Sequence, residues 1–498
     1  MPKRIPIFYS ALLLTGVNLL LRLVGTSFQV YISGRIGPAG VGLLQLVMSV
    51  GNLAMVAGMG GIRTAAMYLT AEELGRKKPE KVTWVLSSCF LYSICLSGAA
   101  AAALYGFAPR IASGWIGNAE TVWALRLLAA FLPVTCLCGV MTGYFTAANR
   151  IGTLAAVEVG EQFISMAGTL AALSLWAGSN AARACQCVVL GSSLGGCFTL
   201  LCLILLRFRE NIRPGEKIPV GRRLFAAAVP LALADVVKSG INTTENLMVP
   251  KRLAQNRNVA QPLAAFGIVS GMVFPVIMFP ACILFGLAEL LIPELARCAA
   301  AGSQKRISYL VRRSLKVAML YGLLFSGLVF LLSDLLCQRL YGSREAAEGM
   351  RLYALLIPML YCDAVTDAMT KGLGQQKLCV RNNILTSALD VALLYILLPK
   401  YGMQGYFASF LVTHLLNFTL SIRLLLRITG ERIPASLPAL GCAAALAALW
   451  GASHMATPLS RCAAFLGLLG SLWWLLGVTG QEDLIWARGL IRRRTVSV

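Results

Sequence analysis

The chain has 498 residues, of which 58% are hydrophobic and only 13% are charged, and its mean hydropathy is +0.74. Soluble domains rarely combine so much apolar sequence with so little charge, so the composition excludes an ordinary soluble enzyme and predicts stacked membrane spans. The net charge of +23 would suggest nucleic-acid binding in a soluble protein, but in a membrane protein it is typical of cations gathered in the loops of one side.

Fourteen apolar runs are long enough to cross a bilayer of about 30 Å as helices. They lie at roughly 8–33, 39–62, 83–107, 121–147, 152–176, 182–206, 224–248, 264–292, 314–336, 350–370, 379–399, 404–426, 436–454 and 459–479. Between the eleventh and twelfth runs we expect a tight turn at 400–405. The predicted fold class is an all-α polytopic membrane protein with about 14 transmembrane helices.

The distribution of Lys and Arg predicts the orientation of these spans. If the N-terminus is inside, 30 of the 44 cations lie in cytoplasmic loops or at cytoplasmic span ends. Cytoplasmic loops carry an excess of cations in most membrane proteins. We therefore expect a multi-pass protein of the cytoplasmic membrane with both termini in the cytoplasm.

Two halves of the chain read as repeats. Arg126 and Pro133 recur as Arg351 and Pro358, both shifted by 225 residues. Both halves would have the same orientation, which predicts a pseudo-twofold axis along the membrane normal. The predicted domains are an N-terminal six-helix lobe at 1–215, a C-terminal six-helix lobe at 216–430, and two additional helices with a basic cytoplasmic tail at 431–498.

Five cations in the spans are candidates for binding an anionic substrate. Arg22 and Lys238 lie near the middle of spans 1 and 7, which occupy equivalent places in the two halves, so we expect both to line a central cavity. Arg35, Arg63 and Arg252 lie nearer the span ends, where snorkelling to lipid headgroups is the alternative.

Carboxylates within the spans form a second set: Glu158, Glu161, Glu245, Asp363, Asp367 and Asp390. All but Asp390 are candidates for coupling to Na⁺ or a proton, because acidic side chains inside membranes often mark ion pathways. Asp363 and Asp367 share a helical face with Lys371 through i, i+4 and i+8 spacing. Internal pairing of the carboxylates with Lys371 or Arg381 is the alternative.

Nothing in the sequence predicts covalent chemistry. The 15 cysteines lie mostly within apolar runs, and pairs such as Cys136 and Cys138 match no common zinc spacing. There is no P-loop, and no loop is large enough for a catalytic domain. We expect no enzyme activity, no cofactor, no metal centre and no nucleic-acid partner.

Four segments together resemble a known family. They are LLLRLVGTSFQVYISGRIGPAGVGLLQLV from Leu19, GYFTAANRIGTLAAVEVGEQ from Gly143, TTENLMVPKRL from Thr243, and GLGQQKLCVRNNILTSALDVALLYILLPKYGMQGYFAS from Gly372. The chain is similar to the family of stage V sporulation protein B and its polysaccharide-exporter relatives. The superfamily also contains lipid II flippases, O-antigen flippases and multidrug extruders. Where the family usually has an Asp in span 7, this chain has Glu245.

The resemblance implies two six-helix lobes around a central cavity, alternating access, and a flippase that moves a polyprenyl-pyrophosphate-linked sugar for spore cortex or cell wall synthesis. Arg22 corresponds to a cavity arginine of the family, and the last two spans would border a groove for the lipid tail. Expected partners are the lipid-linked sugar, membrane lipids, Na⁺ or H⁺, and enzymes of cell-envelope synthesis. The alternative is a cation-coupled multidrug or toxin extruder, although cations at mid-depth disfavour cationic drugs.

Overall fold

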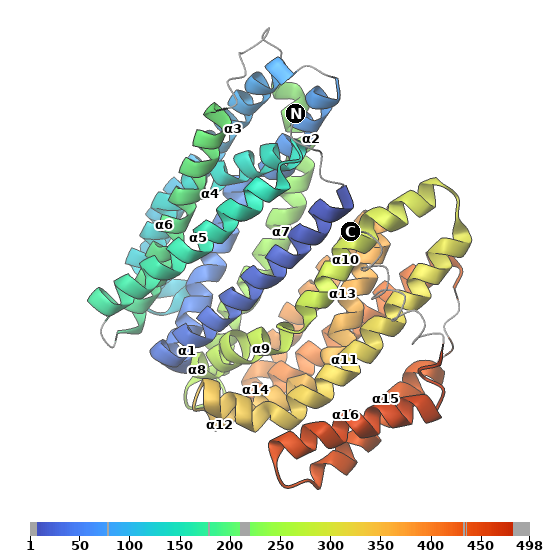
Figure 1. Ribbon diagram of the computed structural model, residues 1–498. Coiled ribbons are helices and arrows are strands. Elements are labelled where there is room, and N and C mark those ends of the chain that lie inside the picture. The colour runs from blue at the N-terminus through green and yellow to red at the C-terminus, as the bar shows by residue number, and fades with distance from the viewer. Residues whose placement is uncertain are drawn as a thin grey trace. The chain divides into compact units, whose positions relative to one another are not determined.

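The computed structural model describes residues 7–76, 79–177, 180–209, 220–431, 434 and 436–481, and within these ranges every regular element is a helix (Figure 1). The basic tail and most of the predicted linker between the halves lie outside the described residues. The elements are α1 (Ile7–Met59), α2 (Ile62–Gly75), η1 (Pro79–Lys81), α3 (Val82–Arg110), η2 (Ile111–Ile116), η3 (Ala119–Thr121), α4 (Val122–Ala147), α5 (Ile151–Ala172), η4 (Leu173–Ala177), α6 (Ala181–Phe208), α7 (Gly221–Leu253), α8 (Pro262–Gly267), η5 (Ile268–Val273), α9 (Phe274–Met278), α10 (Ala281–Ala300), α11 (Gln304–Leu340), α12 (Arg344–Ala354), α13 (Ile357–Gly372), α14 (Gln376–Thr429), α15 (Ser436–Ser453) and α16 (Pro458–Leu475).

Long apolar helices make this a polytopic membrane protein. By length and composition, 7 described helices can cross a membrane, or up to 9 if each of two bent helix pairs is one span. Helices α1 and α14 have 53 and 54 residues, which corresponds to about 80 Å, so each is long enough for two crossings. Each is divided by a glycine with positive φ, Gly37 in α1 and Gly402 in α14. The backbone at Gly402 is not helical, and Ser409 and Thr413 beyond it hydrogen-bond to Asp390 before it, so the chain reverses direction here and the turn predicted at 400–405 is confirmed.

Leucines near the middle of several helices are exposed, as expected for side chains that face lipid. Leu91 of α3 is 66% exposed, Leu201 of α6 58% and Leu233 of α7 67%. In water such exposure would cost hydrophobic free energy, whereas hydrocarbon solvates leucine well. The fourteen predicted spans lie in the described, mainly helical residues, although the spans predicted at 264–292 and 350–370 are bent by 64° and 56°; the all-α polytopic fold is confirmed.

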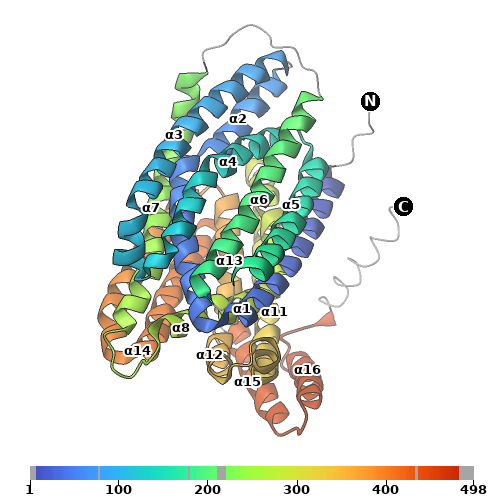
Figure 2. The same ribbon diagram turned by 90° about the vertical axis from the view of Figure 1, so that its left-hand side faces the viewer.

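The chain divides into two compact units, residues 1–275 with 383–413, and residues 276–382 with 414–498. In the first unit, α3, α4, α5 and α6 lie side by side, and α7 packs against α1 and α2 (Figures 1 and 2). Its core includes Tyr144 and Phe145 of α4 and Leu203 of α6. The division predicted near residue 215 falls outside the described residues and stays a prediction.

The second unit is built on α10, α11 and α13. The buried Tyr361 of α13 donates a hydrogen bond to the backbone oxygen of Ile277, at 2.7 Å. Helices α15 and α16 lie side by side and pack on α11 (Figure 1). A Cβ at Gly327 of α11 would lie 2.0 Å from the ring of Phe465, so only glycine lets this buried phenylalanine dock.

We expect Gly267→Ala to destabilise the first unit, because α8 touches the backbone of α1 at this point. The added Cβ would lie 2.1 Å from the oxygen of Pro38 and 2.6 Å from the nitrogen of Gly42, and neither backbone atom can move without shifting a helix. The cost should be about 1–3 kcal/mol. Thermal unfolding in detergent measures it, and Gly98→Ala is the control because nothing lies within 4 Å of its Cβ position. Equal transitions for both variants would refute the close contact.

Candidate functional sites

The mid-span cations lie on two helices of the first unit that pack together. Arg22 on α1 and Lys238 on α7 both have exposed side chains. Gly25, about one turn after Arg22, approaches α5, where Nε2 of Gln162 lies 3.8 Å from the Gly25 Cβ position. Their predicted role as substrate ligands stays a prediction.

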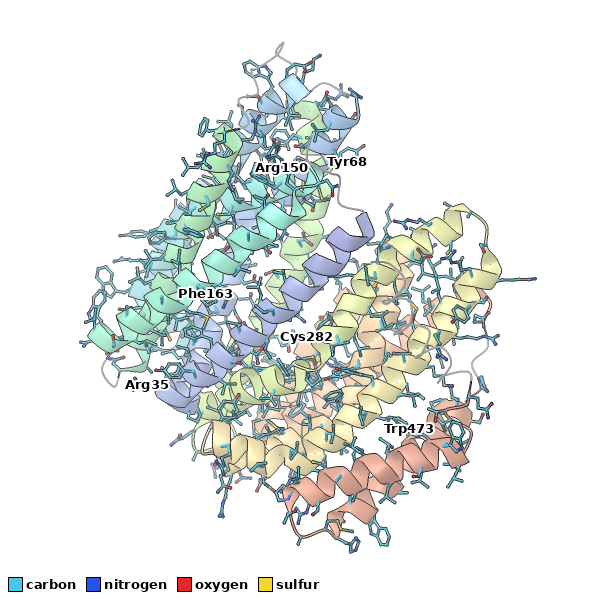
Figure 3. All side chains as sticks on the ribbon, viewed as in Figure 1. Arg35, Tyr68, Arg150, Phe163, Cys282 and Trp473 are labelled. Carbon is cyan, nitrogen blue, oxygen red and sulfur yellow. The ribbon has the colours of Figure 1, made fainter. Side chains whose placement is uncertain are left out.

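Arg35 and Arg252, at one end of the first unit, both contact tyrosines. Arg35 donates from Nε to the hydroxyl of Tyr31 at 3.2 Å, and Figure 3 shows it at the end opposite Arg150. The guanidinium of Arg252 lies 3.3 Å from the ring centroid of Tyr395, a close cation–π contact. Their predicted role in substrate binding stays a prediction.

Arg63 belongs to a polar cluster of α2, α5 and α6. Its guanidinium interacts electrostatically with Glu158, which in turn interacts with Glu161. Oε2 of Glu161 accepts a hydrogen bond from Thr199 at 2.7 Å. The structure thus brings together one predicted cation and two predicted coupling carboxylates, so that an ion entering here would compete with Arg63.

Glu245 of α7 and Asp390 of α14 form a pair of carboxyl groups in the first unit. The two side chains lie close enough to interact electrostatically, and Asp390 is 5% exposed. Oδ1 of Asp390 also accepts from Ser409 at 2.6 Å and from Thr413 at 3.1 Å. Sequence reasoning noticed both residues but not that they meet.

The second unit contains the predicted Asp363, Asp367 and Lys371 of α13. Asp363 accepts a hydrogen bond from Asn417 of α14 at 2.9 Å, while its Oδ1 is buried without a partner among the described residues. Lys371 lies 3.8 Å from Asp367, which also accepts from the thiol of Cys379 at 3.0 Å. Two side chains of α14, Asn417 and Cys379, therefore hydrogen-bond to the predicted acidic face of α13. Within the described ranges, no three His, Cys, Asp or Glu residues come together in a way that could hold a metal ion.

An open groove of about 710 Å³ lies in the second unit between α11, α13, α14 and α15. Its walls are mostly apolar, with Met359, Phe418 and Leu446 among them, and its only charged lining residues in the described part of the chain are Arg312 and Lys316. Arg312 pairs with Glu431, and hydrogen bonds from Ser308 and Arg312 hold the pKa of Glu431 below its ordinary value. An apolar groove with cations along α11 can hold a long hydrocarbon chain and attract an anionic group.

One ion-pair cluster was missed by sequence reasoning. Arg223, at the start of α7, contacts Glu72 at 2.6 Å and Glu73 at 3.0 Å, both at the end of α2. Glu73 is buried, so this contact fastens α2 to α7 at one end of the first unit. The partners are 150 and 151 residues apart, and no spacing rule could have paired them.

Comparison with known proteins places the chain among membrane transporters. The family model MatE matches residues 15–175 and 230–396. Stage V sporulation protein B of Bacillus subtilis (strain 168) is 22% identical over 406 residues, which cover 79% of this chain and 78% of the relative.

Two solved structures share the fold at 14% identity. The lipid II flippase MurJ in an inward closed conformation has a TM-score of 0.71 over 96% of this chain and 100% of that chain. An inward-facing multidrug resistance MATE family transporter of the MOP superfamily has a TM-score of 0.64 over 84% of this chain and 98% of that chain.

Proposed function

This chain belongs to the MatE family, and on that premise we propose that it is a flippase that moves a polyprenyl-pyrophosphate-linked sugar across the cytoplasmic membrane by alternating access. The names of the similar proteins, a lipid II flippase and a sporulation protein, favour a precursor of the cell wall or spore cortex as the cargo. The protein performs no covalent chemistry, both termini are cytoplasmic, and enzymes of cell-envelope synthesis supply and consume its cargo.

The observation that carries the proposal is the apolar groove in the second unit. A polyprenyl chain has no polar group, so apolar groove walls and the adjoining lipid solvate it well. A diphosphate needs cations, and the charged residues in the groove are Lys316 and Arg312, the latter paired with Glu431. The positive charge of Lys316 disfavours a cationic drug, and a free sugar nucleotide has no apolar part that would bind the apolar walls.

The test is binding to the purified full-length protein in nanodiscs. We expect a polyprenyl-pyrophosphate oligosaccharide to bind and a cationic dye of similar size to bind at least tenfold more weakly. Free polyprenol should compete poorly, because it lacks the diphosphate. In cells, depletion of the protein should make a lipid-linked sugar accumulate on the inner leaflet.

A cation-coupled multidrug extruder is the second candidate, favoured by the carboxyl groups that the structure brings together. Such sites bind protons or Na⁺ in exchange for cargo. Dye binding that exceeds lipid binding, and that is lost in Glu158→Gln or Asp363→Asn, would establish the extruder over the flippase.

Cation coupling gives a prediction for Asp363. We expect Asp363→Asn to raise the sodium or proton concentration needed for transport by about tenfold, because the coupling cation loses one charged ligand of the Asp363 and Asp367 pair. The asparagine keeps the hydrogen bond with Asn417, so packing should be preserved. Transport into proteoliposomes across a sodium series and a pH series measures the shift. The control is Glu348→Gln, which removes an exposed carboxylate of α12. If Asp363→Asn leaves the dependence of transport on sodium and pH unchanged, Asp363 and Asp367 do not take part in cation coupling.

A further inference from the structure

A second cavity, of about 790 Å³, lies in the first unit, away from the groove described above. It is walled by η3 and the first turns of α4, by η4, and by the first three turns of α6. We name it the α4–α6 pocket; its lining includes Glu120, Trp123, Trp176 and Arg183. None of the cations or carboxylates predicted for substrate binding or ion coupling lines it, so it belongs to neither site.

The lining changes from polar to apolar along the helices. Glu120, Asn180 and Arg183 lie at the beginnings of helical segments, where the bundle ends. Leu127 and Leu190 lie seven residues beyond Glu120 and Arg183, which is about 10 Å deeper along α4 and α6. This gradient is the one that a phospholipid has from its headgroup to its acyl chains.

Tryptophans mark the depth of the pocket in the membrane. Trp123 is 66% exposed and Trp176 62%, and both line the pocket. Trp115 of η2, close along the chain, is also exposed. Tryptophan is enriched where headgroups meet hydrocarbon, because its ring is apolar and its N–H is polar. The pocket therefore lies at the headgroup level, on the outer side in the topology that the charges predict.

The charges in the pocket are one anion and one cation that do not pair with each other. Oε2 of Glu120 accepts a hydrogen bond from Asn180 at 2.8 Å, which leaves Oε1 for another donor. The oxygen of Asn180 accepts hydrogen bonds from the backbone of Ala182 and Arg183 and so caps α6. Within the described ranges, the guanidinium of Arg183 has no acceptor at hydrogen-bond distance. A ligand with one phosphate and one ammonium group would satisfy both charges.

We propose that the α4–α6 pocket binds a resident zwitterionic phospholipid with a primary ammonium group, as in phosphatidylethanolamine. Arg183 binds the phosphate, Glu120 accepts from the ammonium, and an acyl chain follows Leu127 and Leu190. An anionic phospholipid would leave Glu120 facing a negative headgroup. A phosphocholine headgroup has no N–H to donate to Glu120, and a neutral saccharide would match neither charge. The lipid is not the transported cargo, so this inference stands whether or not the proposed function holds.

Native mass spectrometry of delipidated, full-length protein tests the proposal. Phosphatidylethanolamine, phosphatidylcholine and phosphatidylglycerol with identical acyl chains are added in turn. We expect one phosphatidylethanolamine to be retained, with at least tenfold tighter binding than the other two. Glu120→Gln should abolish the preference over phosphatidylcholine, and Arg183→Gln should weaken binding of all three.

Matched controls are Glu348→Gln and Arg344→Gln, exposed charges of α12 outside the pocket, which should leave retention unchanged. Equal retention of the three lipids, or a preference that survives both pocket variants, would identify only annular lipid and overturn the proposal. Preference for phosphatidylglycerol would make the pocket an anion site. Displacement of phosphatidylethanolamine by a lipid-linked oligosaccharide would assign the pocket to the transport path, and either result refutes a resident zwitterionic lipid.

Discussion

Replacing Arg22 by alanine is expected to abolish complementation of a strain that lacks the protein, while the amount of protein in the membrane stays normal. A charge-assisted hydrogen bond to a partly desolvated diphosphate is worth about 1.5–3 kcal/mol, so its loss should weaken substrate binding by about tenfold to more than a hundredfold. Insertion should not suffer, because removing a charge from an apolar helix makes insertion easier.

Arg22→Lys keeps the charge and should retain part of the activity, since lysine lacks only the bidentate geometry. Arg344→Ala, an exposed arginine of α12, controls for general loss of positive charge. Full complementation by Arg22→Ala at normal protein level would remove Arg22 from the substrate site.

Deleting residues 436–498 is expected to reduce binding of a lipid-linked oligosaccharide at least tenfold while the rest of the chain remains folded. The deletion removes α15, which supplies one wall of the groove through residues such as Pro438 and Cys442. Helices α15 and α16 pack mainly on α11, so the contacts among α10, α11 and α13 survive. Binding in nanodiscs and thermal unfolding measure the two effects separately.

A milder variant separates the groove from the helix that forms it. Cys442→Trp places a large side chain in the groove and should reduce lipid binding with little change in stability. Ala443→Trp, on the same helix but outside the groove lining, is the control. If the truncated protein and the Cys442→Trp variant both bind the lipid-linked oligosaccharide with the affinity of the native protein, the groove does not hold the lipid tail.

Span positions and fold class could be predicted from the sequence because hydrophobicity and length are local properties. A run of about 20 apolar residues must form a helix in hydrocarbon, because a helix is the only conformation in which a single segment pairs all of its own backbone N–H and C=O groups. The face shared by Asp363, Asp367 and Lys371 follows from helical spacing alone, and the 3.8 Å approach of Lys371 to Asp367 agrees with it. The turn at 400–405 was predicted as well, and the backbone leaves helical geometry at Gly402.

Only the tertiary structure decided which polar groups meet. Glu245 pairs with Asp390, Asn417 with Asp363, and Arg223 with Glu73, and each pair joins helices whose packing no sequence period encodes. The same holds for the groove beside α15 and for the α4–α6 pocket, whose walls come from separate segments. Apolar faces can pack in many registers with similar free energy, and side-chain shape, such as Phe465 against Gly327, selects one of them.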